Sequence, residues 1–251
     1  MIEQTITQLR TLKLNGMAEA LLSQSEQPGN YEALSFEERI QLLTDCEQQE
    51  REHRKQQRLL KAARFKINAN ARELDYQHPR GLKQSVMASL LQCDWINKSQ
   101  NLLITGPCGC GKTYITCALG HTACLKGYSV RYYRLSRLLM ALTQAKADGS
   151  YSRLLNQLAK VDLLILDDWG LEPLKAAHRN DLMEIMDDRH NASSTAIISQ
   201  LPTDQWYQSI GDSTLADAIL DRLMHNSHRI KLKGESMRKI QSKLTQRDHL
   251  S

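Results

Sequence analysis

The amino-acid sequence predicts an α/β protein, with a parallel β-sheet flanked by helices and a small all-α domain before it. Three observations support this prediction. From residue 101 onward, short apolar segments alternate with helical patterns, which is typical of a parallel sheet covered on both faces. Before residue 66, apolar residues recur at helical spacing instead. A glycine-rich turn joins the first predicted strand to a helix.

Composition excludes several classes of protein. The 251 residues are 41% hydrophobic and 24% charged, which is enough apolar material for a core and excludes wholesale disorder. A net charge of +5 is compatible with a nucleic-acid partner but does not require one. The first ten residues carry no apolar signal segment, and the strongly apolar run at 161–166 is far below the roughly 18 residues that span a bilayer. Six cysteines without CxxC spacing then predict a cytoplasmic protein with reduced thiols.

The N-terminal part is predicted to be helical. Apolar residues recur every three to five positions between residues 2 and 22, which predicts one amphipathic helix. Ser35 and Glu38 have the spacing of a capping box, so a second helix is expected to start there. Its apolar face holds Phe36, Ile40 and Leu43.

The domain boundaries follow from changes in pattern along the chain. Residues 1–66 are the predicted helical domain, which docks a partner or DNA; 67–85 are a linker, and 86–251 are the α/β domain with a short lid-like C-terminal segment. The stretch 51–66 holds seven basic residues and one acid. This stretch is either a solvated helix face or a surface for phosphates or a partner.

The α/β pattern can be divided into elements. Strands are predicted at 101–105, 129–133, 162–167 and 195–199. Helices are predicted at 112–126, 136–147, 151–159 and 178–190. The two helices between the second and third strands are one more than a minimal crossover needs.

The clearest motif is the sequence GPCGCGKT at residues 106–113. It fits G-x-x-x-x-G-K-[ST] at every fixed position and lies between an apolar strand and a helix. Glycines allow backbone N–H groups to curl around phosphates at a helix N-terminus. Lys112 is expected to reach the β- and γ-phosphates of ATP, and the Thr113 hydroxyl to coordinate Mg²⁺. The predicted nucleotide-binding residues are Gly106, Pro107, Cys108, Gly109, Cys110, Gly111, Lys112 and Thr113.

A second motif supports nucleotide chemistry. The apolar strand 161–166 ends in two acids, Asp167 and Asp168, which is the Walker B pattern. Asp167 is expected to hold Mg²⁺ through a water, and Asp168 to orient or deprotonate the attacking water. A strand capped by two solvated acids would have the same sequence, but the upstream phosphate loop favours the Walker B interpretation.

Five segments together resemble a known family. They read GPCGCGKT, LLILDDWG, IISQLP, ADAILDRLMH and LKGESMRK. Over residues 2–239 the chain resembles the IstB-type helper ATPases of bacterial insertion sequences, a branch of the AAA+ superfamily. Helicase loaders of the DnaC type share the first three motifs. The resemblance implies an AAA+ P-loop NTPase fold.

The resemblance also implies roles for residues near the predicted site. Gln200 occupies the sensor-1 position, where a polar side chain contacts the γ-phosphate or the water. Ser199 is the alternative candidate for this role. Most of the superfamily has Glu at the second Walker B position, where this chain has Asp168. The shorter side chain leaves the rate of hydrolysis open, although not nucleotide binding.

Two arginines match the remaining AAA+ motifs. Arg222 corresponds to the arginine finger, which completes the site of a neighbouring subunit. Arg238 corresponds to the sensor-2 arginine of the lid. The residues alone also permit an ordinary salt bridge of Arg222 with Asp217 or Asp221, and a solvated or DNA-contacting role for Arg238.

These matches imply an ATPase that assembles head-to-tail, as a ring or helical filament, on duplex DNA and assists a cognate transposase. Basic residues around the extra helix either grip DNA or are ordinary surface charge: Arg131, Arg134, Arg137, Lys146 and Arg153. A replicative helicase loader is the first alternative function. A metabolic P-loop kinase is the second, although the AAA+ order of Arg222 and Arg238 argues against it.

Overall fold

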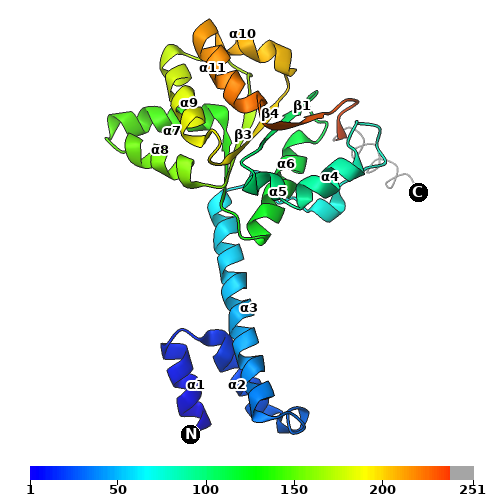
Figure 1. Cartoon of the computed structure of the whole chain (residues 1–251), viewed down its shortest axis with the longest axis vertical. Coiled ribbons are helices and arrows are strands. Elements are labelled where there is room, and N and C mark those ends of the chain that lie inside the picture. Colours follow the sequence, from blue (N-terminus) through cyan, green and yellow to red (C-terminus); the bar gives the residue numbers. More distant parts are fainter. Residues whose placement is uncertain (238–251) are drawn as a thin grey trace, which may run out of the picture. The chain divides into compact units, whose positions relative to one another are not determined.

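The computed structural model describes residues 1–237, and the chain divides into two compact units, Met1–Arg58 and Leu59–Ser251 (Figure 1). The domain boundaries expected at residues 66 and 85 stay predictions. Residues 59–85 nevertheless contribute to the hydrophobic core of the second unit, where Ala69, Leu74 and Leu82 are buried. Among the described residues, no helix is long and apolar enough to cross a membrane.

The first unit contains two helices, a short 3₁₀ turn and most of a third helix, whose last residues belong to the second unit. They are α1 (Ile2–Thr11), α2 (Asn15–Glu26), η1 (Pro28–Asn30) and α3 (Phe36–Ala63). The single helix predicted over residues 2–22 is therefore wrong, because the chain turns between α1 and α2. At the turn Lys13 has a left-handed φ of 62°.

A buried carboxylate explains where α2 begins. Glu47 of α3 is only 6% exposed, and its Oε2 accepts hydrogen bonds from the backbone N–H groups of Gly16 and Met17 at 2.8 and 3.3 Å. Free N–H groups at a helix start need such an acceptor. Gly16 is required here, because a Cβ would lie 2.5 Å from the carbonyl oxygen of Cys46. The partner that caps α2 is thus about thirty residues away in sequence, where local patterning does not reveal it.

Replacing Glu47 by alanine is expected to destabilise the first unit by about 2 kcal/mol, because it removes the cap of α2 and the 2.7 Å ion pair with Arg51. Burial works to raise the pKa of Glu47, but the bonds from Arg51, Met17 and Gly16 outweigh it and lower the pKa below 4.5. The stabilisation is therefore complete above pH 4.5 and is lost as the pH falls through the lowered pKa.

Hydrogen exchange of the α2 amides between pH 7 and pH 3 measures this effect. Glu19→Ala is the matched control, because its ion pair with Arg10 is exposed and contributes little. If Glu47→Ala exchanged no faster than Glu19→Ala at pH 7, the capping role would be wrong.

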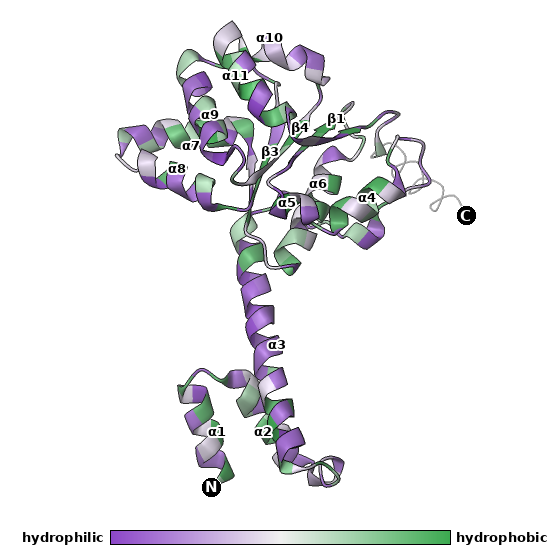
Figure 2. Ribbon diagram, viewed as in Figure 1, coloured by the Kyte–Doolittle hydropathy of each residue, from purple (hydrophilic) through white to green (hydrophobic). Residues whose placement is uncertain are grey.

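Helix α3 begins with the predicted capping box. The Glu38 side chain accepts from the Ser35 N–H at 2.7 Å, and the Ser35 hydroxyl accepts from the Glu38 N–H at 3.2 Å. Of the predicted apolar face only Leu43 is buried; Phe36 is 73% exposed. The middle of α3 is mostly hydrophilic (Figure 2).

The second unit is built on a five-stranded parallel sheet in the order β2-β3-β4-β1-β5. The strands are β1 (Asn101–Thr105), β2 (Val130–Arg134), β3 (Leu163–Trp169), β4 (Ser194–Ser199) and β5 (Ser227–Lys231). The four predicted strands are confirmed within two residues. Strand β5 was missed, because its sequence SHRIK buries only Ile230 and shows no apolar run. The predicted α/β fold class is confirmed.

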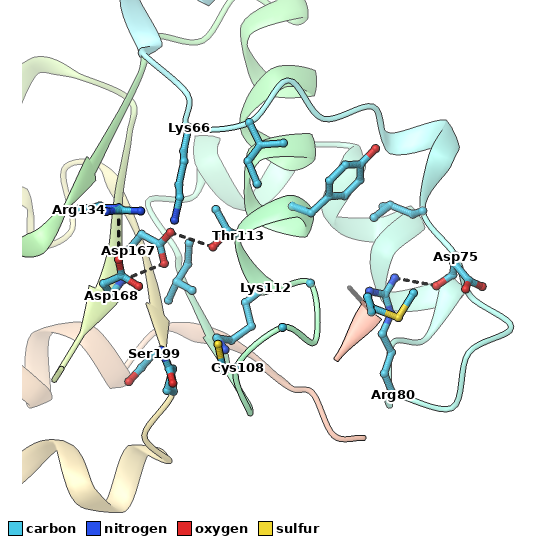
Figure 3. A pocket seen from close by; sticks show the side chains of 18 of the residues that line it. Lys66, Asp75, Arg80, Cys108, Lys112, Thr113, Arg134, Asp167, Asp168 and Ser199 are labelled. Atoms are coloured by element: carbon cyan, nitrogen blue, oxygen red, sulfur yellow. Dashed lines mark hydrogen bonds and ion pairs between the residues drawn. The ribbon is translucent and has the colours of Figure 1, made fainter. Parts of the chain in front are cut away.

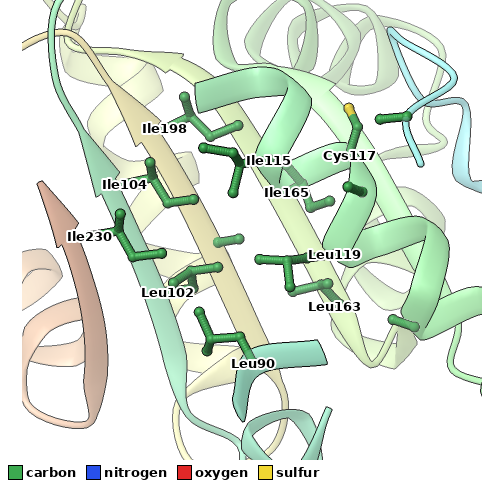
Figure 4. Close-up of a cluster of buried hydrophobic side chains, with 14 of the residues drawn as sticks. Leu90, Leu102, Ile104, Ile115, Cys117, Leu119, Leu163, Ile165, Ile198 and Ile230 are labelled. Carbon is green, nitrogen blue, oxygen red and sulfur yellow. The ribbon is translucent and has the colours of Figure 1, made fainter. Parts of the chain in front are cut away.

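Helices cover both faces of the sheet (Figure 1). One face carries η2 (Ala71–Glu73), α4 (Gln84–Leu91), α5 (Asp94–Asn97) and α6 (Lys112–Leu125). The other face carries α7 (Leu135–Ala147), α8 (Tyr151–Lys160), α9 (Ala176–Arg189), η3 (Thr203–Gln205), α10 (Trp206–Ile210) and α11 (Ser213–Met224). Alternate residues of β1 supply both cores: Leu102 and Ile104 face α6, and Leu103 faces the other layer (Figure 4).

Candidate functional site

A cavity of about 680 Å³ lies at the carboxyl ends of β1, β3 and β4 (Figure 3). In a parallel sheet with helices on both faces, ligands bind outside these strand ends. The predicted loop 106–113 joins β1 to α6 and forms one wall of the cavity, and the end of β3 forms another. Residues 66–80 form a third wall, which the sequence did not predict.

The loop needs glycine for its conformation and its packing. Gly109 and Gly111 have φ of 82° and 92°, in the left-handed region that favours glycine. A Cβ on Gly109 would lie 2.2 Å from the Ser236 hydroxyl, and one on Gly111 would lie 2.5 Å from the Arg80 guanidinium. Ser236 and Arg80 therefore pack against the loop. The inner surface of the loop and the α6 N-terminus face the cavity.

The Lys112 ammonium lies inside the loop. Its Nζ donates to the carbonyls of Gly106 and Pro107 at 2.7 and 2.8 Å. Cys110 is fully buried and its carbonyl accepts from Arg80, whereas Cys108 is exposed at the rim of the cavity. Five of the eight predicted loop residues therefore line the cavity: Cys108, Gly109, Gly111, Lys112 and Thr113.

Asp167 is almost completely buried at the end of β3. Its Oδ2 accepts from the Thr113 hydroxyl at 2.9 Å and from the Tyr132 hydroxyl at 2.6 Å. Burial and the bond to Asp167 raise the pKa of Tyr132, so this hydroxyl stays a donor. The structure therefore brings the predicted Mg²⁺ ligands Thr113 and Asp167 together, although they are 54 residues apart in sequence.

Asp168 turns away from the regular strand. Its φ is 64°, and the register between β3 and β4 shifts after Leu166. The Asp168 carboxylate lines the cavity, 3.5 Å from the Arg134 guanidinium. A non-glycine residue at positive φ is strained and is found often at functional sites.

Of the two sensor-1 candidates, Gln200 has the free side chain. Both line the cavity, but the Ser199 hydroxyl is 1% exposed, donates to Trp169 O at 2.7 Å and accepts from Leu201 N–H at 3.0 Å. Gln200 is exposed at the cavity edge. The role of Gln200 stays a prediction that this geometry favours.

Arg222 lies on α11 and does not line the cavity of its own chain. Its guanidinium pairs with Asp187 of α9 at 2.7 Å, rather than with Asp217 or Asp221. Arg238, the sensor-2 candidate, lies outside the described residues. The preceding Met237 lines the cavity, and its N–H donates to Gly109 O at 2.9 Å.

The contact of Arg80 with the phosphate loop was not predicted from the sequence. Arg80 is 4% exposed; its guanidinium donates to Asp75 O and Cys110 O at 2.7 and 3.2 Å, and its Nε has no partner among the described residues. The Lys233 N–H donates to Arg80 O. An arginine in a turn-like HPRG segment carries no local signal of such a contact.

The five basic residues predicted to grip DNA differ in their environment. Arg131 donates to Ala62 O, Arg134 pairs with Asp168, and Lys146 pairs with the buried Asp181. These three interactions bind the charged groups of Arg131, Arg134 and Lys146 to other residues of the same chain. Arg137 and Arg153 are exposed, and neither forms an ion pair in the described part of the chain.

The predicted Mg²⁺ would need oxygen ligands from the substrate as well as from the protein. Within residues 1–237, no group of three or more His, Cys, Asp or Glu could hold a metal ion. Mg²⁺ usually takes one or two protein oxygens together with substrate phosphates and water. The Thr113 hydroxyl and the Asp167 carboxylate, paired beside the phosphate loop, fit that pattern.

Known proteins resemble the chain over nearly its whole length. Residues 7–245 match the family described as IstB-like ATP binding protein. A protein of Sinorhizobium fredii, named as an insertion-sequence ATP-binding protein, is 47% identical over 94% of this chain and 96% of its own. A second such protein, from insertion sequence IS1162 of Pseudomonas fluorescens, is also named as an ATP-binding protein; it is 48% identical over 81% of this chain and 88% of its own.

Solved structures support the fold. The DnaC helicase loader matches with a TM-score of 0.53 at 21% identity, over 66% of this chain and 97% of its own. AMPPCP-bound DnaA from Aquifex aeolicus matches with a TM-score of 0.57 at 21% identity, over 72% and 56%. At these identities the likeness shows an AAA+ fold only. The family match and the curated relatives show more: the chain belongs to the IstB-like ATP-binding proteins of insertion sequences.

Proposed function

We propose that this protein hydrolyses ATP and uses the nucleotide to control its own head-to-tail assembly on duplex DNA, where it assists a transposase. The observation that carries the proposal is the Thr113–Asp167 pair beside the phosphate loop, with Asp168 next to it. This arrangement supplies a phosphate cradle, two metal ligands and a carboxylate for water in a single cavity.

Each residue then has a chemical task. Lys112 exchanges its loop carbonyls for the β- and γ-phosphates, and Thr113 and Asp167 hold Mg²⁺, which neutralises developing charge. Asp168 orients the attacking water, with Gln200 at the same cavity edge. The ion pair with Arg134 positions the Asp168 carboxylate before the reaction.

Arg222 supports the assembly step. Its absence from the lining of its own cavity supports a role on a neighbouring subunit, where its guanidinium would leave Asp187 for the γ-phosphate. A contact in which one surface meets a different surface of the next copy generates rings or filaments. The γ-phosphate charge attracts the incoming guanidinium, so hydrolysis weakens the contact.

Electron microscopy with duplex DNA tests the proposal. Regular DNA-bound oligomers are expected with ATP or a non-hydrolysable analogue, and dispersed subunits with ADP. Monomers in every nucleotide state would overturn it. Strong preference for single-stranded DNA would favour a helicase loader instead.

Arg137 and Arg153 are expected to contribute to DNA binding. The double change to alanine should lower the slope of log affinity against log salt by about two, since each lost phosphate contact accounts for roughly 0.9. Fluorescence anisotropy at several salt concentrations measures this slope. Lys98→Ala, which removes an exposed charge beside α5, is the control. Equal slopes for the double variant and this control would exclude the α7–α8 surface.

A further inference from the structure

Besides Lys112, Arg134 and Arg80, a fourth cation lines the nucleotide cavity, and none of the motifs includes it. Lys66 lines the cavity from the segment that follows α3. In Figure 3 its side chain extends toward the side of the cavity where Thr113 and Asp167 lie. Within residues 1–237 its ammonium forms no ion pair. In the sequence, Lys66 stands out only as the last basic residue of the stretch 51–66.

The segment around Lys66 is held in place by its neighbours. Helix α3 ends at the fully buried Ala63, and Arg64 then has a left-handed φ of 55°. Phe65 and Ile67 both pack into the core against α6. Phe65 packs so closely that a Cβ on Gly120 would lie 2.7 Å from its ring. Phe65 is thus held in the core, while Lys66 and Ile67 both line the cavity.

The other cations of the cavity are already engaged. Lys112 is bound to loop carbonyls, Arg134 is paired with Asp168, and Arg80 donates to Asp75 O and Cys110 O. ATP brings one more phosphate than ADP, at the end where the metal ligands lie, and this phosphate needs positive charge. At that end Lys66 supplies an ammonium that forms no ion pair within residues 1–237.

We propose that Lys66 binds the terminal phosphate of ATP and so distinguishes the triphosphate from the diphosphate. The inference rests on the proposed ATP-dependent function and adds a sensing residue to it.

Calorimetric titration with a non-hydrolysable ATP analogue and with ADP, both with Mg²⁺, tests the assignment. Lys66→Met keeps the length of the side chain without its charge, and Lys66→Arg keeps the charge. We expect Lys66→Met to lose about tenfold in affinity for the analogue, with ADP affinity unchanged and with recovery in Lys66→Arg. Lys61→Met is the matched control, because Lys61 is an exposed lysine of α3 that does not line the cavity.

The outcomes separate this inference from the proposed function. If the parent protein binds the analogue and Lys112→Ala does not, while Lys66→Met behaves like Lys61→Met, only the role of Lys66 is wrong. Equal losses for the analogue and ADP would also overturn it, because the terminal phosphate would not be what Lys66 contacts. If the parent itself binds no nucleotide, the proposed function fails.

Hydrogen exchange gives an independent measurement. Amides 64–67 of the parent are expected to exchange more slowly with the ATP analogue than with ADP, and this difference should vanish in Lys66→Met. A difference that persists in Lys66→Met would show that another residue senses the terminal phosphate.

Discussion

Lys112→Ala is expected to lower the affinity for ATP by about ten- to a hundredfold and to abolish nucleotide-dependent assembly on DNA. Hydrogen bonds between an ammonium and charged phosphates contribute about 1.5–3 kcal/mol, which corresponds to this range. The same ammonium also ties the loop together through the carbonyls of Gly106 and Pro107. Calorimetric titration measures the first effect, and sedimentation with duplex DNA measures the second.

The control for this variant comes from the other end of the same helix. Lys126 is the C-cap of α6, is exposed, and donates to Gln92 O. Lys126→Ala removes an equal charge without touching the cavity and should bind ATP like the parent. A Lys112→Ala protein that still coated DNA in the presence of ATP would contradict the assembly mechanism.

Arg222→Ala is expected to lower kcat for ATP hydrolysis in the assembled state by about a thousandfold, the lower end of the range for arginine fingers. Its own nucleotide affinity should change little, because Arg222 does not line its own cavity. Phosphate release in the presence of DNA measures the effect. Arg229→Ala, at a nearby exposed arginine of β5, serves as the control.

Mixing two inactive variants tests whether Arg222 acts between subunits. The Lys112→Ala variant keeps Arg222 but lacks a working phosphate loop. The Arg222→Ala variant keeps the phosphate loop but lacks the arginine finger. At an interface between the loop of an Arg222→Ala subunit and the Arg222 of a Lys112→Ala subunit both parts are intact, so the mixture should form such pairs and hydrolysis should partly return. Absence of recovery in mixed assemblies that do form would show that Arg222 acts within its own chain or not at all.

Much of the fold could be predicted from local patterns. Strands β1, β3 and β4 are buried at nearly every position, so they appear as apolar runs, whereas β2 is buried only at Val130 and Tyr132. Strand β5 is half-exposed and left no such run. The turn between α1 and α2 depends on Glu47, whose contact with Gly16 crosses 31 residues. Both misses involve partners that a local window does not contain.

The candidate site divides in the same way. The phosphate loop and the two acids after β3 could be predicted, because their chemistry requires particular residues at fixed spacing. Lys66, Arg80 and Arg134 line the cavity from distant parts of the chain, and Tyr132 donates to Asp167 there. No spacing rule connects them to the loop, and for Arg134 the sequence left open only DNA contact or ordinary surface charge.

The sequence by itself determined that this protein has a phosphate loop, a paired acidic strand end and an α/β fold, since each depends on residues adjacent in the chain. Tertiary structure alone decided which cations face the nucleotide and which are neutralised elsewhere. The reason is physical: an ion pair or hydrogen bond depends on separations of 3–4 Å in space. In this chain those separations join residues such as Arg134 and Asp168, or Thr113 and Asp167, that the sequence keeps far apart.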